Sequence, residues 1–407
     1  MKKSALRSYA KLIAVMGGGI RKGQSVVIQA GLEQPEFVEI LVEECYKAGA
    51  GKVSVEWSHD PLTKLHVQYQ EEEVLSATQN WELEKLAYLR DTLPVMIYLE
   101  SSDPDGLNGI DQEKYMKALQ AKSLVRKPYR DAMDNKYQWC IAGVPGVAWA
   151  KKMYPHLRKN QAVEQLWKDI LHVSRAEGDP IANWKEHNAA LRKRCEYLNS
   201  LGLRKLHYTA DNGTDLTVGL IPGSIFEGGS EKTMGGVEFN PNIPSEEIFT
   251  SPKAGEAEGI VYATKPLSYM GQLIENFSVR FEGGKAVEVH AEKNEDLLKA
   301  IIAMDPNACM LGECALIPTA SPISETGLLF YSTLYDENAS CHLALGAGFN
   351  ETHPGYENLS LKELQEIGIN DSLIHEDFMI GCESMDIDGF DENGNCYPIF
   401  RRGEWAF

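Results

Sequence analysis

Residues 25–57 read SVVIQAGLEQPEFVEILVEECYKAGAGKVSVEW and decide the fold of the first half of the chain. The short apolar run Ser25–Ala30 is typical of a buried strand, and Lys52–Trp57 alternates like a second strand. Between them, Glu36–Ala48 has helical spacing of its apolar residues and ends at Gly49, a common helix terminator. Strand, helix and strand in this order indicate a unit with parallel strands.

The same alternation continues on both sides of this unit. We expect helices and strands in turn at Ser4–Met16, Trp81–Arg90, Val95–Leu99, Gln112–Arg130 and Gln138–Gly143. A mostly polar helical stretch, Gln161–Ser200, leads out of this region. Strands separated by helices predict a parallel sheet that is covered on both faces. We therefore predict a three-layer α/β domain over residues 1–202.

The pattern changes after Gly202. Short alternating runs, separated by Gly, Asn and Pro, predict strands at Leu206–Ala210, Leu216–Leu220, Gly259–Thr264, Glu275–Phe281 and Ala286–Ala291. Only one clear helix, Asn294–Met304, is expected before residue 360. Because a chain of 407 residues exceeds the size at which one core keeps growing, we predict a second, strand-rich α+β domain over residues 203–407.

Composition restricts the function. The chain is 43% hydrophobic and 24% charged, as in soluble globular proteins. Its 40 basic and 59 acidic residues leave a net charge of −19, which argues against nucleic-acid binding because such sites need a cationic face. The sequence has no apolar run long enough for a membrane span or a signal peptide. The eight cysteines include no C-x2-C pair and suit free thiols in a reducing cytoplasm, so we expect a cytoplasmic protein.

Four segments of the second half place acids or histidines inside short apolar or Gly-containing runs, where an unpaired charge is costly to bury. The six side chains concerned are Glu247, Glu313, Glu337, His342, His375 and Asp377. Carboxylates and imidazoles together suit divalent cations. A pair of divalent metal ions is the simplest explanation for this set.

The residues themselves support the members of this set unequally. Glu313 lies within an apolar strand-like run, whereas its neighbour Cys314 projects from the opposite face and is expected in the core. His375 and Asp377 are two residues apart and share one face of a strand. A further strand is predicted to begin at His342, and Cys341 beside it is also expected in the core. The other two acids, Glu247 and Glu337, gain little support from local pattern alone.

Other groups of residues suggest a function but are better explained by a structural role. Gly17–Gly19 precedes a strand, and no Gly-Lys-Ser/Thr follows it, so a phosphate-binding loop is not indicated. Ser321 and Ser324 lack the G-x-S-x-G context of a serine hydrolase. Gly228–Gly229 and Gly235–Gly236 are predicted to be turns or a mobile flap.

The sequence resembles the metallo-aminopeptidases of the aminopeptidase T, aminopeptidase S and PepS type over its whole length. The resemblance rests on IRKGQSVVIQA (20–30), NGTDLTVGL (212–220), NIPSEEIFTSP (242–252), LGECALIP (311–318), LYDENASCHLALG (334–346) and HEDFMIG (375–381), in this order. It implies an N-terminal α/β domain, a C-terminal catalytic domain and a homodimer.

The resemblance also implies a reaction. The six residues take the ligand positions of a dinuclear site for two divalent metal ions (Zn, Co, Mn or Mg) with a bridging water. Glu313 is expected to assist deprotonation of that water, and the substrates are expected to be short peptides that lose their N-terminal residue.

One position departs from the family pattern. Seven residues after the ligand His342, the similar enzymes often carry a tyrosine near the metals, and this chain carries Phe349. A phenyl ring donates no hydrogen bond, so turnover should be lower here unless another donor such as Tyr356 replaces the hydroxyl. Loss of one such donor typically costs about 3 kcal/mol of barrier.

Two other functions are compatible with the same residues. Related scaffolds resemble mononuclear iron dioxygenases that open hydroxypyridine rings with a similar His/Glu/Asp set. The third function is a metal-stabilised binding or structural protein without turnover. One iron with oxygen uptake would favour the dioxygenase, and two zinc, cobalt or manganese ions would favour the peptidase.

Overall fold

The computed structural model describes residues 1–101 and 103–407. The chain divides into two compact units. Unit 1 comprises Met1–His187, Ser230–Ser245 and Met270–Gln272. Unit 2 comprises Asn188–Gly229, Glu246–Tyr269 and Leu273–Phe407. The predicted domain boundary between residues 202 and 203 stays a prediction. The two units are defined by how compactly the chain packs, and this does not show where an independently folding domain begins or ends.

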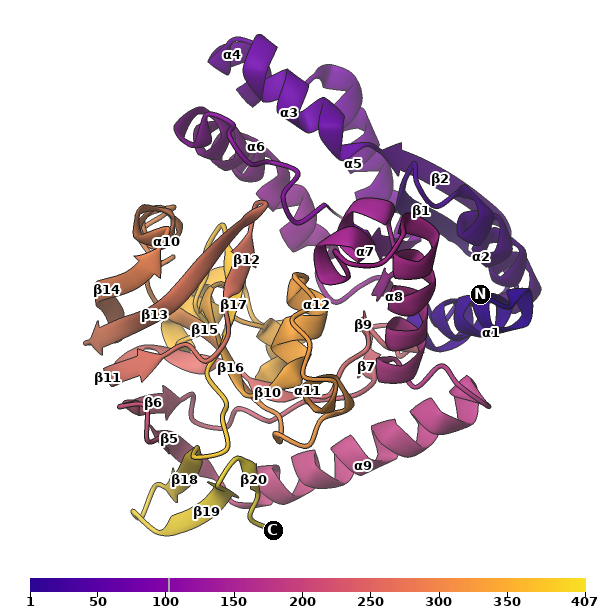
Figure 1. Ribbon diagram of the computed structural model, residues 1–407. Coiled ribbons are helices and arrows are strands. Elements are labelled where there is room, and N and C mark those ends of the chain that lie inside the picture. Colours follow the sequence, from indigo (N-terminus) through magenta and orange to yellow (C-terminus); the bar gives the residue numbers. More distant parts are fainter. Residues whose placement is uncertain (102) are drawn as a thin grey trace. The chain divides into compact units, whose positions relative to one another are not determined.

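Unit 1 is built on a five-stranded parallel sheet with the order β2-β1-β3-β4-β9 (Figure 1). Its strands are β1 (Ser25–Gly31), β2 (Lys52–Ser58), β3 (Val95–Glu100), β4 (Trp139–Gly143) and β9 (Asn242–Ile243). The predicted parallel sheet is therefore confirmed, and its first four strands lie where the sequence pattern placed them. The short β9 was not predicted, since it joins this sheet from the second half of the chain.

Helices cover both faces of this sheet, which confirms the three-layer arrangement. They are α1 (Lys3–Leu12), α2 (Pro35–Ala48), α3 (Asp60–Tyr69), α4 (Glu72–Ser76), α5 (Asn80–Thr92), α6 (Gln112–Met133), α7 (Val147–Met153), α8 (Lys159–Val173) and α9 (Pro180–Ser200), the last of which continues into unit 2. On one face, Leu89 of α5 and Met133 of α6 pack against Val27 and Met96 of the sheet. Rings of α1, α2 and α8 form a separate cluster of Tyr9, Phe37 and Trp167.

The prediction of one continuous helical stretch over Gln161–Ser200 was wrong. Helices α8 and α9 are separated by a turn in which Gly178 has a φ of +68°. Pro180 cannot donate a backbone hydrogen bond, and the Asp179 side chain accepts one from the Ala182 N–H to start the second helix. The sequence pattern also missed α3, α4 and α7.

Unit 2 is rich in strands, as predicted, and contains two antiparallel sheets. The larger sheet has nine strands in the order β12-β13-β11-β6-β5-β18-β19-β20, with β14 paired to β13. Its strands are β5 (Leu203–Thr209), β6 (Asp215–Leu220), β11 (Pro252–Tyr262), β12 (Leu267–Tyr269), β13 (Gln272–Glu282), β14 (Lys285–Lys293), β18 (Asp386–Asp391), β19 (Cys396–Arg401) and β20 (Glu404–Trp405).

The smaller sheet has four strands in the order β10-β15-β16-β17. Its strands are β10 (Ile248–Thr250), β15 (Leu311–Leu316), β16 (His342–Gly346) and β17 (His375–Met379). The helices that accompany the two sheets are α10 (Glu295–Ile302), α11 (Pro322–Glu325), α12 (Thr333–Asp336) and α13 (Leu361–Ile367). Of these, α10 confirms the one helix predicted before residue 360, whereas α11 and α12 were missed.

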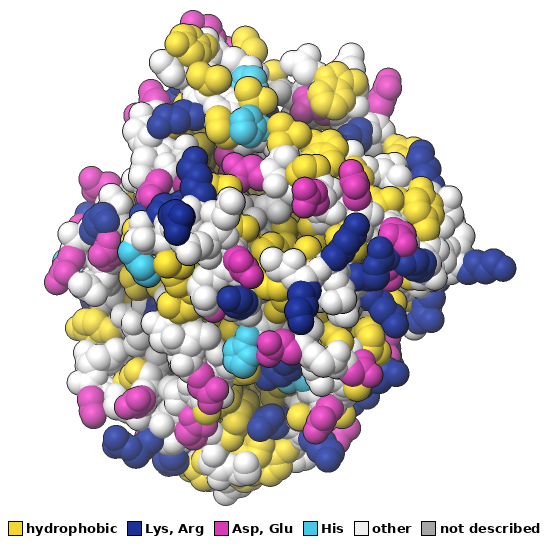
Figure 2. Space-filling view, turned by 45° about the vertical axis from the view of Figure 1, so that its right-hand side comes forward, with side chains coloured by type: hydrophobic (Ala, Val, Ile, Leu, Met, Phe, Trp, Pro, Cys, Tyr) yellow, Lys and Arg dark blue, Asp and Glu magenta, His cyan; other side chains and the backbone are white. Residues whose placement is uncertain are grey.

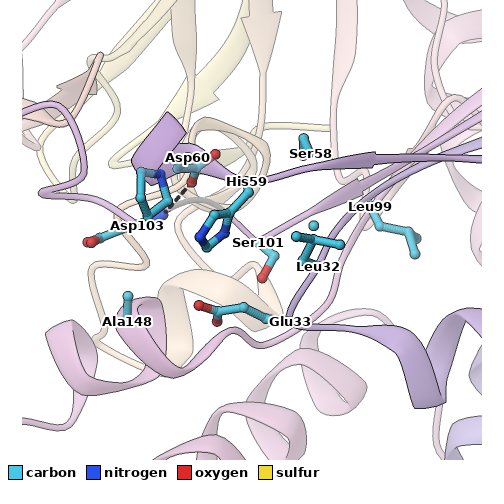
Figure 3. A pocket seen from close by; sticks show the side chains of 11 residues that line it. Leu32, Glu33, Ser58, His59, Asp60, Leu99, Ser101, Asp103 and Ala148 are labelled. Atoms are coloured by element: carbon cyan, nitrogen blue, oxygen red, sulfur yellow. Dashed lines mark hydrogen bonds between the residues drawn. The ribbon is translucent and has the colours of Figure 1, made fainter. Parts of the chain in front are cut away.

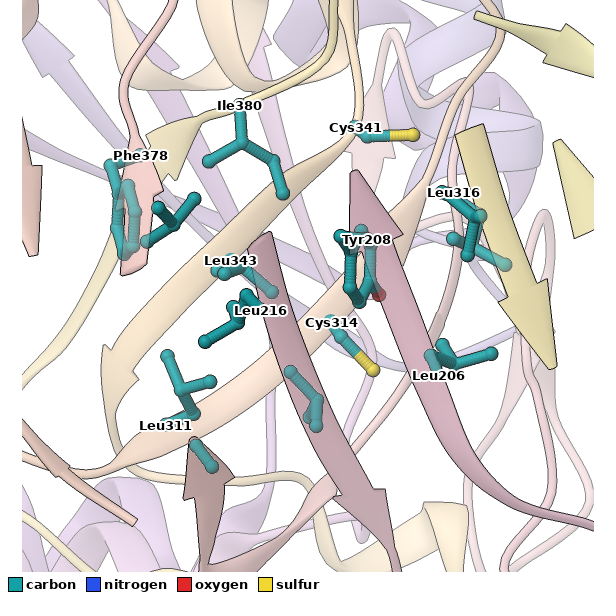
Figure 4. Packing of buried hydrophobic residues seen from close by; sticks show 14 of the residues in the cluster. Leu206, Tyr208, Leu216, Leu311, Cys314, Leu316, Cys341, Leu343, Phe378 and Ile380 are labelled. Atoms are coloured by element: carbon teal, nitrogen blue, oxygen red, sulfur yellow. The ribbon is translucent and has the colours of Figure 1, made fainter. Parts of the chain in front are cut away.

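The core of unit 2 lies between its two sheets (Figure 4). One face of the four-stranded sheet presents Cys314, Leu343 and Phe378 to a cluster that includes Leu216 and Tyr208 of the larger sheet. Burial of each large apolar side chain contributes roughly 1.5–3 kcal/mol. The opposite face of the four-stranded sheet therefore carries the side chains that do not belong to this core.

Several smaller expectations are also settled. Cys314 and Cys341 are buried in this core, as predicted, and all eight cysteines are free thiols. Gly235–Gly236 forms the turn between the short strands β7 (Glu231–Lys232) and β8 (Glu238–Phe239). None of the helices formed by the described residues is long and apolar enough to cross a membrane. On the face shown in Figure 2, acidic and basic side chains are interspersed.

Candidate metal centre

The register of the four-stranded sheet brings four of the six candidate side chains to one face. Glu313 on β15 and Asp377 on β17 both lie opposite Ala344 on the strand between them. His342 lies opposite Ala315, which is two residues after Glu313 and shares its face. His375 precedes Asp377 by two residues and shares its face as well. Because alanine has only a methyl group, space remains between the longer side chains.

The other two acids come from segments next to the sheet. Glu247 immediately precedes β10 and shares a face with Phe249, which lies opposite Ala315. Glu337 begins a 3-10 helix, Glu337–Ala339, that leads into β16. These two positions depend on how loops pack, which explains why local sequence pattern supported them weakly.

The six side chains converge in a largely buried cluster. The exposed fractions of Glu247, Glu313, Glu337, His342 and Asp377 are 8%, 3%, 8%, 1% and 8%. The side chain of His375 is 27% exposed and is therefore the member of the set that solvent reaches most easily. All six residues that the sequence singled out are thus brought together.

Their donor atoms form two overlapping groups. Glu247, Glu313 and His342 make one group, and Glu313, His375 and Asp377 make the other; in each, the donor atoms lie within 4.8 Å of one another. The Nε2 atom of His342 is 3.2 Å from Glu247 Oε2. The Nε2 atom of His375 is 3.1 Å from Glu313 Oε2 and 3.4 Å from Asp377 Oδ1. Glu313 belongs to both groups, and the carboxyl of Glu337 lies close enough to Asp377, Glu247 and Glu313 to be affected by their charges.

Backbone carbonyls set the orientation of both imidazole rings. His342 Nδ1 lies 3.0 Å from the Glu337 carbonyl oxygen, and His375 Nδ1 lies 2.7 Å from that of Ala347. Since a carbonyl oxygen only accepts hydrogen bonds, Nδ1 carries the hydrogen in each ring. Nε2 of each ring therefore points at the carboxylates. This is the arrangement found in metal-ligating histidines.

The imidazoles need a positive charge in this environment. With Nδ1 protonated, a neutral ring would direct its Nε2 lone pair at carboxylate oxygens. Burial alone would lower the pKa of His342, but the hydrogen bond with Glu247 and the charges of Glu313 and Asp377 raise it to about 9. Burial would likewise lower the pKa of His375, but the nearby carboxylates of Asp377 and Glu313 raise it well above its ordinary value.

The buried carboxylates also need a compensating positive charge or a proton. Burial raises the pKa of Glu313 to about 7, and burial with the charges of Asp377 and Glu247 raises the pKa of Glu337 well above its ordinary value. Burial would also raise the pKa of Asp377, but the nearby charge of His375 holds it below its ordinary value. Among the described residues, Asp377 Oδ1 has no hydrogen-bond partner, because the His375 contact lacks the required geometry. Divalent cations fit this donor set, since they would satisfy that oxygen and take the place of the protons.

Two supporting side chains were not found from the sequence. Asn338 is fully buried; its Oδ1 accepts from the Glu246 N–H at 2.7 Å, and its Nδ2 donates to Glu337 Oε1 at 3.2 Å. It therefore ties the segment carrying Glu247 to Glu337. Ser251 Oγ accepts from the Phe349 N–H at 2.7 Å. Asn338 could have been suspected from its position directly after an acid of the set.

The ring of Phe349 lies beside the cluster. Its centroid is 4.8 Å from that of His375 and 5.1 Å from that of Phe249. The position thus borders the site with an apolar ring. Tyr356, the alternative donor, packs against a separate cluster that contains Leu364.

Comparisons with known proteins identify similar chains of known family. The chain is 38% identical over 404 residues to aminopeptidase AmpS from Bacillus subtilis, covering 99% of this chain and 98% of that one. It is 39% identical over 410 residues to aminopeptidase PepS from Streptococcus thermophilus, covering 99% and 98%. The solved structure of wild-type AmpT from Thermus thermophilus matches with a TM-score of 0.90 and 38% identity over 100% of both chains.

A 2,5-dihydroxypyridine dioxygenase from Pseudomonas putida matches with 12% identity and a TM-score of 0.49, a likeness too weak to inform the reaction. The family model described as thermophilic metalloprotease (M29) matches residues 2–405. The chain therefore belongs to the thermophilic metalloprotease (M29) family, which confirms its resemblance to metallo-aminopeptidases of the aminopeptidase T, aminopeptidase S and PepS type.

Proposed function

We propose that this chain is a metallo-aminopeptidase that removes N-terminal residues from short peptides at a dinuclear metal centre. The observation that carries the proposal is the pair of buried donor groups that share Glu313. A single ion would need only one of these groups. Membership of a metalloprotease family supports a peptide as the substrate.

In this proposal each residue has a defined role. Glu247 and His342 would hold one cation, His375 and Asp377 would hold the other, and Glu313 belongs to both groups. Glu337, which lies close to Asp377, would complete the ligand set. When bound, the cations supply the Lewis acidity that polarises a carbonyl group and makes water a better nucleophile. Glu313 is our choice as acceptor of the proton from the attacking water, because it lies between the two groups.

The charge of the site favours exopeptidase action at the amino end. Four carboxylates attract the free ammonium group of a peptide and repel its C-terminal carboxylate. The exposed edge of His375 indicates the side from which a substrate reaches the cluster. A carboxypeptidase activity is therefore disfavoured.

The test is the variant Glu313→Gln, assayed with aminoacyl-amides under saturating metal. Glutamine has the shape of glutamate but is neither a base nor a charged ligand, so we expect hydrolysis to fall at least about 10²-fold, with the weaker metal binding offset by the saturating metal. Metal content is measured in the same preparation by plasma mass spectrometry. Unchanged turnover with both metals present would remove Glu313 from the mechanism.

Chelation followed by addition of single metals identifies the native ion. We expect activity to return with two equivalents of Zn, Co, Mn or Mg per chain. Activity that needs one iron and consumes oxygen would instead support the ring-cleaving dioxygenase. Two bound metals with no cleavage across a panel of aminoacyl substrates would support the structural alternative.

We further propose a cytoplasmic homodimer. The free thiols fit a reducing compartment, and the dimer rests on the resemblance to aminopeptidases of this type. Size-exclusion chromatography with light scattering measures the mass in solution, against 45.3 kDa for one chain.

A further inference from the structure

Unit 1 contains a hollow at the carboxyl ends of its parallel strands that the proposed peptidase reaction does not use. The sheet order places β2 and β3 on opposite sides of β1. Because parallel crossovers are right-handed, the connections after the neighbouring strands β1 and β3 leave toward opposite faces of the sheet. A crevice opens where they part, and this is where open α/β sheets generally bind ligands.

The hollow has a volume of about 100 Å³ and is formed by the loops that follow β1, β2 and β3 (Figure 3). Six polar side chains line it: Glu33, Ser58, His59, Asp60, Ser101 and Asp103. In Figure 3, His59, Ser101 and Glu33 lie around the same space, with Asp60 and Asp103 on the far side of the imidazole. Polar groups from three separate loops therefore converge on one small volume.

Hydrogen bonds hold this wall in place. Gln34, which is 5% exposed, donates to Ser101 Oγ at 2.7 Å and to the Val144 carbonyl oxygen at 3.2 Å. Because Gln34 supplies the hydrogen of the first bond, the Ser101 hydroxyl keeps its own hydrogen for another acceptor. Glu33 Oε2 accepts from the Val147 N–H at 3.0 Å.

A close backbone approach completes the wall. A Cβ atom at Gly146 would come within 2.7 Å of Ser101 Oγ and 2.9 Å of Glu33 Oε2, so a larger residue there would have to displace both side chains. On the other side, Asp60 Oδ2 accepts from the Asp103 N–H at 3.3 Å. The carboxylates are thus positioned by backbone donors rather than neutralised by basic side chains.

The lining selects for positive charge. Among the described residues that form this hollow, three are carboxylates and none is Lys or Arg. The net charge of −19 adds a general attraction for cations. A bare metal ion fits poorly, since the groups of donor atoms found within 4.8 Å of one another among the described residues are those of the metal centre. A larger cation with several N–H donors matches the spread of acceptors better.

A second hollow continues from the first. It has a volume of about 340 Å³, shares Asp60, Pro61 and Asp103 with the first, and is also lined by Leu65 and Lys64. Lys64 Nζ donates to the Asn108 carbonyl oxygen at 2.5 Å. Pro61, Leu65 and the lysine methylenes offer apolar surface next to the polar hollow.

We propose that these joined hollows bind a small primary ammonium compound that carries a short apolar substituent. The ammonium group lies among Glu33, Asp60 and Asp103 in the polar hollow, and the substituent lies against Pro61 and Leu65. The site belongs to unit 1 alone and does not depend on the proposed peptidase function. Free aliphatic amines and amino acids with apolar side chains both supply this chemistry.

The test measures binding of isobutylamine to the full-length, metal-loaded chain by saturation-transfer NMR and calorimetry. We expect a dissociation constant on the order of 1 mM, as is reasonable for so small a ligand. Isobutanol has a similar shape without the charge and should not compete. Leucine, titrated in parallel, should bind more weakly than isobutylamine, because the three carboxylates of the hollow repel its own carboxylate.

Variants locate the site. Glu33→Gln and Asp60→Asn should each weaken binding at least about tenfold, because a charged acceptor is lost. Glu36→Gln, an exposed acid on the neighbouring helix, should bind as the original chain does. Peptide hydrolysis should be unchanged in all three.

Three results would overturn the proposal. One is the absence of saturable binding up to about 50 mM, well beyond the expected range. Another is equal binding of isobutylamine and isobutanol, which requires no variant and so does not depend on folding. The last is binding that survives in both pocket variants and disappears in Glu313→Gln, which would place the amine at the metal centre.

Discussion

At the scale of single residues, Asn338 makes the most specific prediction about how the metal centre is held. Replacing it with alanine leaves the Glu246 N–H and the Glu337 carboxyl without their buried partner. We expect a loss of about 1–3 kcal/mol in the free energy of unfolding and a 10–100-fold loss in metal affinity. Thermal unfolding and metal titration measure the two effects.

Asn358 provides the matched control for this prediction. It also bonds to the glutamate that precedes it, at 3.3 Å, but it is exposed. Asn358→Ala should leave both unfolding and metal affinity within the error of the measurement. An equal loss in the two variants would mean that burial and position at the centre do not matter.

Phe349 gives a prediction of gain rather than loss. The variant Phe349→Tyr adds a hydroxyl to a ring whose centroid is 4.8 Å from that of His375. If that hydroxyl reaches the developing oxyanion, kcat should rise by up to about 10²-fold, since one such donor is worth about 3 kcal/mol. Steady-state kinetics on leucyl-amides separates an effect on kcat from one on KM. A lower kcat would show that this chain uses the apolar ring in another way.

The residues also show where sequence reasoning reaches its limit. His375 and Asp377 could be assigned to a shared face because strand periodicity alone decides it, and Glu313 was indicated by its position within an apolar run. Glu247 and Glu337 lie in a loop and a 3-10 helix, where no period relates sequence to direction, and their assignment needed the family resemblance. The position of Asn338 directly after Glu337 is a weak sequence signal, but its bond to the Glu246 N–H joins segments far apart in sequence, which no local pattern contains.

At the scale of elements, the centre depends on the small residues of β15 and β16. Ala344 lies between Glu313 and Asp377 in the register of the sheet and is fully buried. Ala344→Val keeps a strand-forming residue but places two methyl groups between the donors. We predict that metal content falls below one ion per chain and that stability falls by about 1–3 kcal/mol through overpacking.

Ala286 on β14 serves as the comparison for that substitution, because it lies on a strand of the other sheet and is only partly buried. The Ala286→Val variant should bind as much metal as the original chain. If Ala344→Val also binds two ions with unchanged affinity, space between the donors is not a requirement of this site.

The elements that escaped prediction have a common physical cause. The two-residue β9 gains its strand conformation from parallel pairing with Ile141 and Ala142 rather than from its own pattern. The break between α8 and α9 depends on the turn at Gly178 and the cap at Asp179, which interrupt an otherwise continuous helical composition. In both cases a contact or a cap outweighs local propensity.

At the scale of the whole molecule, metal binding should stabilise the fold. Four carboxylates gathered in one buried cluster repel one another unless protons or cations compensate them. A metal present at 100 times its dissociation constant adds about 2.7 kcal/mol to the free energy of unfolding. We therefore expect chelation to lower the Tm by a few degrees, and addition of metal to restore it, in differential scanning calorimetry. A Tm that does not respond to chelation, despite proven loss of metal, would contradict a buried centre.

Metal binding should also release protons, and the direction follows from the shifted pKa values. In the metal-free protein the pKa of His342 is raised from 6.5 to about 9, so its ion pair stabilises the fold fully below pH 6.5 and less as the pH rises through 9. A metal ion needs the unprotonated Nε2, and also needs Glu313, whose pKa is raised to about 7, as a carboxylate. At pH 7 binding must therefore expel at least about one proton per chain, and affinity must increase with pH up to about 9. Calorimetry in buffers of different ionisation enthalpy counts these protons, and the count should fall as the pH rises through 9. A count near zero at pH 7 would mean that the cluster holds no exchangeable proton where the cations bind.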